Sequence, residues 1–207
     1  MRFEFIAGAL CLDFANTIHD SRAEDNEEEL HTISDVLQWA EEARLLSSAD
    51  HGRLAAHYRG NSREAAAAFS RSLTTRNLLL AIFGSIANGR PASSRYLSEL
   101  NSALAQAPGL LSVRKNANRI ETEWTSSAHG LQRVLFVVLT SAAELLASER
   151  LGRIRECASA DCTWLFVDES RNHSRRWCEM RACGNRMKAR RHYQRTTAKT
   201  KRPKGTM

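Results

Sequence analysis

The sequence contains little proline and glycine, and it has no long uninterrupted apolar run. Only 3 Pro and 10 Gly occur among 207 residues, of which 43% are hydrophobic and 26% are charged. A mainly disordered or collagen-like chain is therefore excluded. The longest apolar candidate, Leu131 to Ala147, is interrupted by Gln132, Arg133 and Glu144, which argues against a transmembrane span and against a membrane partner.

A secretory signal is also missing from the start of the chain. The stretch MRFEFIAGALCLDFANT has one basic residue, and it carries Glu4 and Asp13 where a signal peptide would be apolar. We therefore expect a cytoplasmic protein that folds on its own.

Acidic residues are scarce at one end of the chain. Residues 1–150 carry 15 basic and 18 acidic side chains, whereas residues 151–207 carry 15 basic and 5 acidic ones. From Ser170 onward Glu179 is the single acid among 13 basic residues. Such an asymmetry is typical of a module that meets a polyanion, of which nucleic acid is the commonest in a cytosol.

The common signatures of enzyme chemistry are absent as well. The sequence shows no phosphate-cradling glycine loop, no paired acids and no set of nucleophile, base and orienting residue. We expect a protein that is not an enzyme. The alternative is an enzyme with a pocket near Asp13 and Arg76.

The first 150 residues have mainly helical periodicity. Apolar residues at intervals of three and four predict helices over residues 30–45, 50–58, 62–89, 93–106 and 130–146, the last of them buried in the centre of the domain. Two β-prone runs, Leu110–Arg114 and Arg119–Trp124, flank turn-forming residues and predict a β-hairpin.

Four of the five cysteines lie within a short stretch, as two pairs of equal spacing: Cys157, Cys162, Cys178 and Cys183. In a reducing compartment such pairs favour a metal over disulfides. Four thiolates suit a tetrahedral Zn²⁺ and leave no open coordination position, so we expect one structural zinc ion. The alternatives to a zinc site are ordinary buried thiols and a redox dithiol. We do not expect His173 to be a metal ligand. The fifth cysteine, Cys11, is expected to pack in the core.

The segments around these cysteines predict a treble-clef-like finger. A β-prone run, Thr163–Val167, follows the first pair, and a helix-compatible basic run, Gly184–Arg195, follows the second. The aromatic residues Trp164, Phe166 and Trp177 either form a small core or stack on bases. Three arginines are suited to offset the charge of the thiolates: Arg155, Arg181 and Arg186.

The segment RIRECASADCTWLFVDESRNHSRRWCEMRACGNRMKARRHYQR resembles the CGNR zinc finger, which is named for the tetrad at Cys183–Arg186. Upstream, GALCLDFANTI and the long helix carrying Arg76 resemble the ABATE domain, which precedes this finger in a bacterial family named for stress-induced transcription regulation. The resemblance implies a DNA-binding transcription regulator.

The predicted architecture is thus α+β. A mainly helical, ABATE-like sensor or assembly domain with a small β-hairpin spans residues 1–150. A treble-clef-like zinc finger ending in a basic helix spans residues 151–195, and a disordered basic tail spans residues 196–207. A homodimer is the default expectation for the assembly.

The basic region supplies the candidate nucleic-acid contacts: Arg171, Arg175, Arg176, Asn185, Arg186, Lys188, Arg190, Arg191 and Arg195. Among them Asn185, Arg186 and Arg190 are candidates for base edges, although Asn185 could instead brace the finger and Arg186 could balance the thiolates. RNA binding, including a ribosome-associated role, and a merely solubilising function are the alternatives to DNA binding.

A polar cluster in the helical domain is a candidate effector pocket. On a helix Asp13, Asn16 and Thr17 would share one face, and Arg76 could meet Asp13 from the long helix. The ligand would be a small polar or anionic effector anchored by Arg76. The alternative is a buried Asp–Arg pair, with Asn16 capping a helix.

Overall fold

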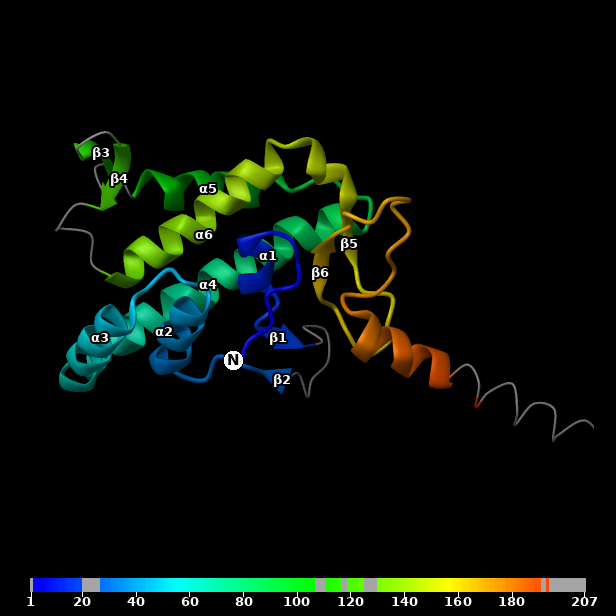
Figure 1. Ribbon diagram of the computed structural model, residues 1–207, viewed down its shortest axis with the longest axis horizontal. Coiled ribbons are helices and arrows are strands. Elements are labelled where there is room, and N and C mark those ends of the chain that lie inside the picture. Colours follow the sequence, from blue (N-terminus) through cyan, green and yellow to red (C-terminus); the bar gives the residue numbers. More distant parts are fainter. Residues whose placement is uncertain are drawn as a thin grey trace, which may run out of the picture.

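The computed structural model describes residues 2–19, 27–106, 111–116, 119–124, 130–190 and 193. It shows an elongated helical body with a small β-hairpin at one end and the cysteine-bearing segment at the other (Figure 1). The predicted tail over residues 196–207, Arg191 and Arg195, and the first residue of the predicted hairpin, Leu110, lie outside the described residues.

The helical body consists of α1 (Leu10–Ala15), α2 (Ile33–Glu42), α3 (Ser48–Gly60), α4 (Ser62–Ala87), α5 (Ser94–Ala105) and α6 (Gly130–Leu146). Side chains cap the starts of α3 and α4: the Ser47 hydroxyl accepts a hydrogen bond from the Asp50 N–H, and the Asn61 side chain accepts one from the Glu64 N–H. The five helices predicted from periodicity correspond to α2, α3, α4, α5 and α6, with ends that differ from the predicted ones, whereas α1 is not among them.

The short helix α1 lies at the centre of this body. It is packed against α4 and α6 (Figure 1), and its side chains Cys11, Leu12 and Phe14 are completely buried. The Phe14 ring meets Trp39 of α2 edge-on, with 4.7 Å between the ring centroids. The core role expected for Cys11 is confirmed, and burial raises the pKa of its thiol to about 12.

Three two-stranded antiparallel sheets occur in the part of the chain that the structure describes. Strand β1 (Ile18–His19) pairs with β2 (Glu27–Glu28), β3 (Leu111–Asn116) with β4 (Arg119–Trp124), and β5 (Ile154–Glu156) with β6 (Leu165–Val167). The β3–β4 hairpin and the strand at β6 confirm predictions, whereas β1, β2 and β5 were not recognised from the sequence. The α+β class, with a mainly helical N-terminal part, is confirmed.

The β5–β6 hairpin is packed into the same core as the helices. A short 3₁₀ helix, Glu149–Arg153, leads from α6 into β5, and the side chains of Ile154, Leu165 and Val167 are at most 1% exposed within the core that α1, α4 and α6 build. The Val167 N–H also donates to the Ala7 carbonyl at 2.8 Å. The apolar core is therefore continuous across the boundary predicted near residue 150, and the division into two domains stays a prediction.

Gly8 is required where the N-terminal segment passes this hairpin. Its φ of +82° lies in the left-handed region, which side chains with a Cβ disfavour. A Cβ at Gly8 would lie 3.4 Å from the Cβ of Val167. The positive φ rather than the approach to β6 therefore favours glycine at this position.

Among the described helices, none combines the length and the apolarity that crossing a bilayer requires.

Candidate metal centre and nucleic-acid interface

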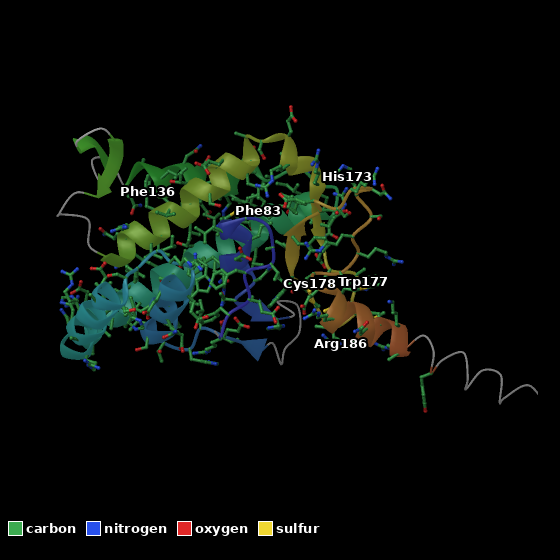
Figure 2. All side chains as sticks on the ribbon, viewed as in Figure 1. Phe83, Phe136, His173, Trp177, Cys178 and Arg186 are labelled. Carbon is green, nitrogen blue, oxygen red and sulfur yellow. The ribbon has the colours of Figure 1, made fainter. Side chains whose placement is uncertain are left out.

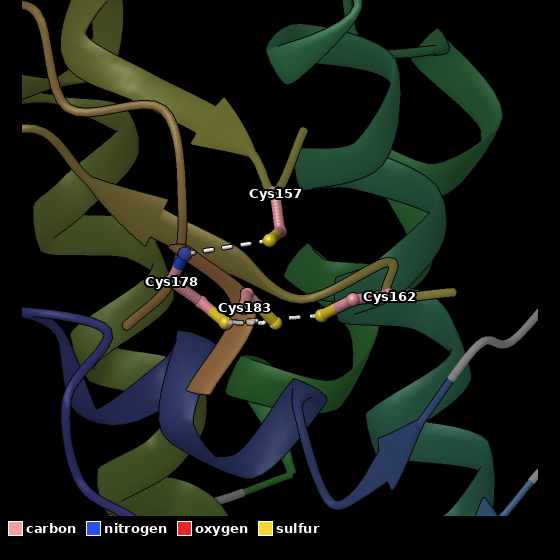
Figure 3. A group of neighbouring side chains, drawn as sticks. All are labelled: Cys157, Cys162, Cys178 and Cys183. Carbon is pink, nitrogen blue, oxygen red and sulfur yellow. Dashed lines mark hydrogen bonds between the residues drawn. The ribbon is translucent and has the colours of Figure 1, made fainter. Parts of the chain in front are cut away.

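The four clustered cysteines converge on one point. Their sulfur atoms all lie within 4.8 Å of one another, with 3.8 Å between the sulfurs of Cys162 and Cys178 and 3.6 Å between those of Cys178 and Cys183 (Figure 3). A tetrahedron with Zn–S bonds of about 2.3 Å has S···S edges of about 3.8 Å. The donor set and its spacing therefore fit a single zinc ion.

Backbone hydrogen bonds bring the two pairs together. The Cys157 N–H donates to the Trp164 carbonyl at 2.8 Å, and the Ala158 N–H donates to the Arg176 carbonyl at 2.8 Å. The Cys178 N–H in turn points at the Cys157 sulfur, at 3.4 Å (Figure 3). The two cysteine turns are thus held in register by the chain itself.

The fourth zinc ligand, Cys183, lies in a π-helical turn. The π-helical segment Met180–Gly184 carries Cys183 and passes directly into the α-helix at residues 185–190 (Figure 1). The ligand Cys183 therefore sits at the root of the basic helix. Zinc at this site would fix the position from which the helix projects.

The cluster lies in an apolar setting. Its four cysteines are at most 5% exposed and pack with Trp164 and Phe166, and Ile6 and Trp177 cover them from outside. The indole N–H of Trp164 donates to the Ile18 carbonyl at 3.2 Å. The core role expected for Trp164 and Phe166 is confirmed, because neither ring is free to stack on a base.

The electrostatics of the cluster suit a bound cation. Hydrogen bonds from the thiols of Cys162 and Cys178 and from a backbone N–H lower the pKa of Cys157, so this sulfur ionises readily. Their hydrogen bonds to Cys157, together with burial, raise the pKa of Cys162 and Cys178. Four thiolates this close are stable only around a multivalent cation, and Zn²⁺ supplies the charge that keeps all four ionised.

The residues considered as partners of the thiolates make different contacts. Arg186 donates to the Cys183 sulfur at 3.5 Å, as a partner of the thiolates should. Arg155 instead donates to the carbonyls of Gly152 and Ile154, at 2.9 and 2.8 Å. The ring of His173 is outside the cluster (Figure 2), where its Nδ1 bonds to the Asp168 carbonyl at 3.3 Å.

The described nucleic-acid candidates, with one exception, are exposed at the far end of the molecule: Arg171, Arg176, Asn185, Arg186, Lys188 and Arg190. Arg171 and Arg176 belong to the loop before Cys178, and the other four to the helix at residues 185–190. Figure 2 shows Arg186 at the start of that helix, next to Cys178 and Trp177.

Arg175 is the exception, because its guanidinium is used inside the finger. It donates to the carbonyls of Trp177 at 3.0 Å and Ile6 at 3.3 Å, and to that of Cys178. It also lies 4.3 Å from the centroid of the Phe166 ring. No spacing in the sequence distinguishes this arginine from its neighbours.

Asp168 organises the loop that carries these arginines, and the sequence analysis missed it. Its carboxylate accepts hydrogen bonds from the N–H and hydroxyl of Ser170, at 3.0 and 2.5 Å, and from the Arg175 N–H at 3.0 Å. Burial alone would raise the pKa of Asp168, but these hydrogen bonds outweigh it and lower the pKa. The carboxylate thus stays ionised and holds the loop turned back on itself.

The four residues of the expected effector cluster are all buried, from 1% to 8% exposed. Asp13 accepts the Ala7 N–H at 2.9 Å, and the Thr17 hydroxyl donates to the Phe14 carbonyl at 2.9 Å. Arg76 finds its carboxylate partner in Glu28, at 2.5 Å, rather than in Asp13.

Asn16, the remaining member of the expected effector cluster, follows α1 directly. Its carboxamide donates to the Leu165 carbonyl and accepts the Leu165 N–H, both at 2.8 Å. Most polar groups of the cluster are therefore occupied by bonds that hold the fold, whereas the Nε of Arg76 is buried without a hydrogen-bond partner in the described chain.

A four-cysteine zinc finger built onto a helical domain is the class of protein that this arrangement defines. Two family models match the chain: the ABATE model, described as "putative stress-induced transcription regulator", over residues 8–149, and the CGNR zinc finger over residues 153–196. The chain belongs to the ABATE family, and its finger carries one structural Zn²⁺ at the four cysteines. No curated protein matches the sequence.

Proposed function

We propose that this chain regulates transcription by binding duplex DNA through the exposed cations of its finger. One observation carries the proposal: five arginine and lysine side chains project from the loop and helix around the metal centre, namely Arg171, Arg176, Arg186, Lys188 and Arg190. Within the described chain the only carboxylate recorded against them is Asp161, 3.8 Å from Arg190, in a pair exposed on both sides. Such a pair contributes little, so Arg190 remains available to a nucleic acid.

The finger holds this surface in place before any ligand arrives. The helix at residues 185–190 starts at the ligand Cys183, and the loop is fixed by Asp168. A prearranged cationic surface loses less conformational entropy on binding than a flexible tail does. This distinguishes the finger from a basic tail that only increases solubility.

The residues of this surface are assigned to phosphate contacts, to base contacts or to the metal centre. Arg171, Arg176 and Lys188 are assigned to phosphates, which position the protein without reading sequence. Asn185 and Arg190 are assigned to base edges, because Asn pairs with adenine and Arg with guanine. Arg186 already bonds to the Cys183 sulfur and serves the metal centre first.

Fluorescence anisotropy with a labelled pool of random-sequence duplexes tests the proposal. If the three assigned phosphate contacts form, the slope of log K against log salt is about −2.7. Replacing Lys188 and Arg190 together by alanine should reduce the magnitude of that slope by about 1, because Lys188 is the phosphate contact of the pair. A matched double replacement of Arg63 and Arg90, two exposed arginines of the helical body, should leave it unchanged.

Measuring the zinc content of every variant distinguishes the loss of a DNA contact from unfolding of the finger. Binding that the Lys188 and Arg190 replacements do not alter would contradict the proposal. Preferential competition by structured RNA at the same ionic strength would instead assign the surface to RNA. Genome-wide capture of the bound nucleic acid would then identify the target.

A further inference from the structure

A cavity of about 260 Å³ lies in the helical body, away from the finger, between α4, α5 and α6. Residues of α4, the end of α5 and one face of α6 line it, among them Arg71, Thr74, Thr75, Ala103, Leu135 and Leu139. None of these residues belongs to the polar cluster around Asp13 and Arg76.

The two walls of the cavity have different chemistry. The α6 wall is mostly apolar, with Leu135, Phe136, which Figure 2 marks on this helix, and Leu139 beside the carboxamide of Gln132. The α4 wall opposite presents hydroxyl groups, among them those of Thr74 and Thr75, beside a guanidinium. A ligand that fits must therefore have an apolar body and a polar end.

Arg71 is the one charged residue among those that line the cavity. Its side chain is exposed and, like that of Arg63 on the same helix, has no hydrogen bond or ion pair recorded within the described chain. Arg76 bonds to Glu28 at 2.5 Å, and Arg95 bonds to Glu99 at 2.9 Å. An unpaired guanidinium next to hydroxyl and amide groups is suited to an anion, and to a carboxylate in particular.

We infer that this cavity binds a small amphipathic carboxylate, with its apolar body on Leu135, Phe136 and Leu139 and its carboxylate on Arg71. The volume is just below the roughly 300–1,000 Å³ of common ligand sites, so the ligand is small. The inference does not depend on what the finger binds. It goes beyond the proposed function, because it places a ligand site where neither family model assigns one.

The cavity also adjoins helices that reach the finger. Beyond Thr75, α4 continues to Ala87, and the next residue, Asn88, donates to the Glu156 carboxylate of β5 at 2.9 Å. At its far end α6 is followed by the 3₁₀ helix that leads into β5. A ligand in the cavity therefore contacts two elements that carry the β5–β6 hairpin.

Isothermal titration calorimetry of the zinc-loaded full chain with 2-naphthoate tests the inference. This probe combines a rigid apolar body with one carboxylate, and 2-naphthol is its neutral counterpart of similar shape. Arg71→Gln removes the cation, Ala103→Phe fills the cavity, and Thr75→Val removes one hydroxyl at constant size. Arg63→Gln, eight residues earlier on α4 and outside the lining, is the matched control.

We expect one 2-naphthoate per chain, bound more tightly than 2-naphthol. Arg71→Gln should weaken 2-naphthoate about tenfold without changing 2-naphthol, because a charge-assisted bond is lost. Ala103→Phe should abolish binding, and Arg63→Gln should leave it unchanged.

No binding of 2-naphthoate to the native chain would overturn the inference, as would equal affinities in Arg71→Gln and the control. If Ala103→Phe does not fold, a loss of affinity in Thr75→Val, with unchanged thermal unfolding, supports the site on its own. If the affinity for 2-naphthoate is unchanged in all three lining variants, the probe binds elsewhere and the inference is overturned. None of these results alters the DNA measurement, so the two proposals fail separately.

Discussion

The side chain of Asn16 and the backbone of Leu165 exchange two hydrogen bonds, each 2.8 Å long, across 149 positions of the sequence. The carboxamide thus acts as an extra pairing partner for β6. Because Asn16 is 3% exposed and Leu165 is 1% exposed, no water replaces either bond. This contact joins the finger to the helical body at a buried point.

Replacing Asn16 by leucine should therefore be costly. The variant leaves the N–H and the carbonyl of Leu165 buried without partners, and each unsatisfied group costs about 1–3 kcal/mol. We expect the free energy of unfolding in urea to fall by about 2–4 kcal/mol. Asn77→Leu, at an exposed site on α4, is the control, with an expected change within about 0.5 kcal/mol. Equal effects would show that the Asn16 bonds contribute nothing.

Loss of a zinc ligand should abolish metal binding selectively. In Cys178→Ser or Cys183→Ser, three thiolates remain and the tetrahedral set is incomplete, so stoichiometric zinc should be lost. Far-ultraviolet circular dichroism should keep most of its helical signal, because α1, α4 and α6 form their own contacts. Cys11→Ser lies outside the cluster and should retain one zinc per chain. Full retention of zinc in the ligand variants would refute the assignment.

Asp13 should make the stability of the fold depend on pH. Burial raises the pKa of its carboxyl from 3.8 to about 6, against the effect of hydrogen bonds from Ala7 and Ile6. The folded chain therefore holds this proton more tightly than the unfolded chain. The resulting stabilisation is complete below pH 3.8 and is lost as the pH rises through about 6.

Asp13→Asn isolates this effect, because the amide keeps an oxygen for the Ala7 N–H but does not ionise. Near neutral pH the variant should be more stable than the native chain by up to about 3 kcal/mol, and in acid the two should converge. Urea unfolding of both proteins across the acid range measures the difference. A difference that is constant with pH would contradict the raised pKa.

The adjacent residues Arg175 and Arg176 should behave differently. Arg175→Gln removes donors from the carbonyls of Trp177, Cys178 and Ile6, so it should lower the thermal stability of the finger and its affinity for zinc. Arg176→Gln changes an exposed side chain whose recorded contact is with the Trp177 ring, so it should weaken DNA binding and leave zinc unaffected. Chelator competition and anisotropy on both variants measure this contrast, and identical behaviour would contradict it.

Much of the local structure follows from the sequence. Periodicity predicts the helices and the β3–β4 hairpin because their signals lie within a few residues of one another. The four cysteine ligands are also predictable, since metal chemistry restricts both the residue type and the spacing. The convergence of their sulfurs agrees with that prediction.

The contacts between distant segments could not be predicted in this way. Asn16 has the same local pattern whether it lines a pocket or pairs with Leu165, and Arg175 has the same charge as Arg176. The strand β5 is three residues long and pairs only with β6, so its own sequence carries almost no signal. The cavity beside Arg71 likewise depends on how three helices pack.

The contact surface between the helical body and the finger, which we call the seam, limits which fingers can be exchanged between members of such a family. A finger transplanted from a relative would bring its own β6, and Gly8, Asn16 and the Ala7 carbonyl of the host would have to match it. Chimaeras that fold should therefore carry the N-terminal segment, which includes Ala7, Gly8 and Asn16, and the finger from the same parent. Substitutions on the two sides of the seam are expected to accumulate together over evolutionary time.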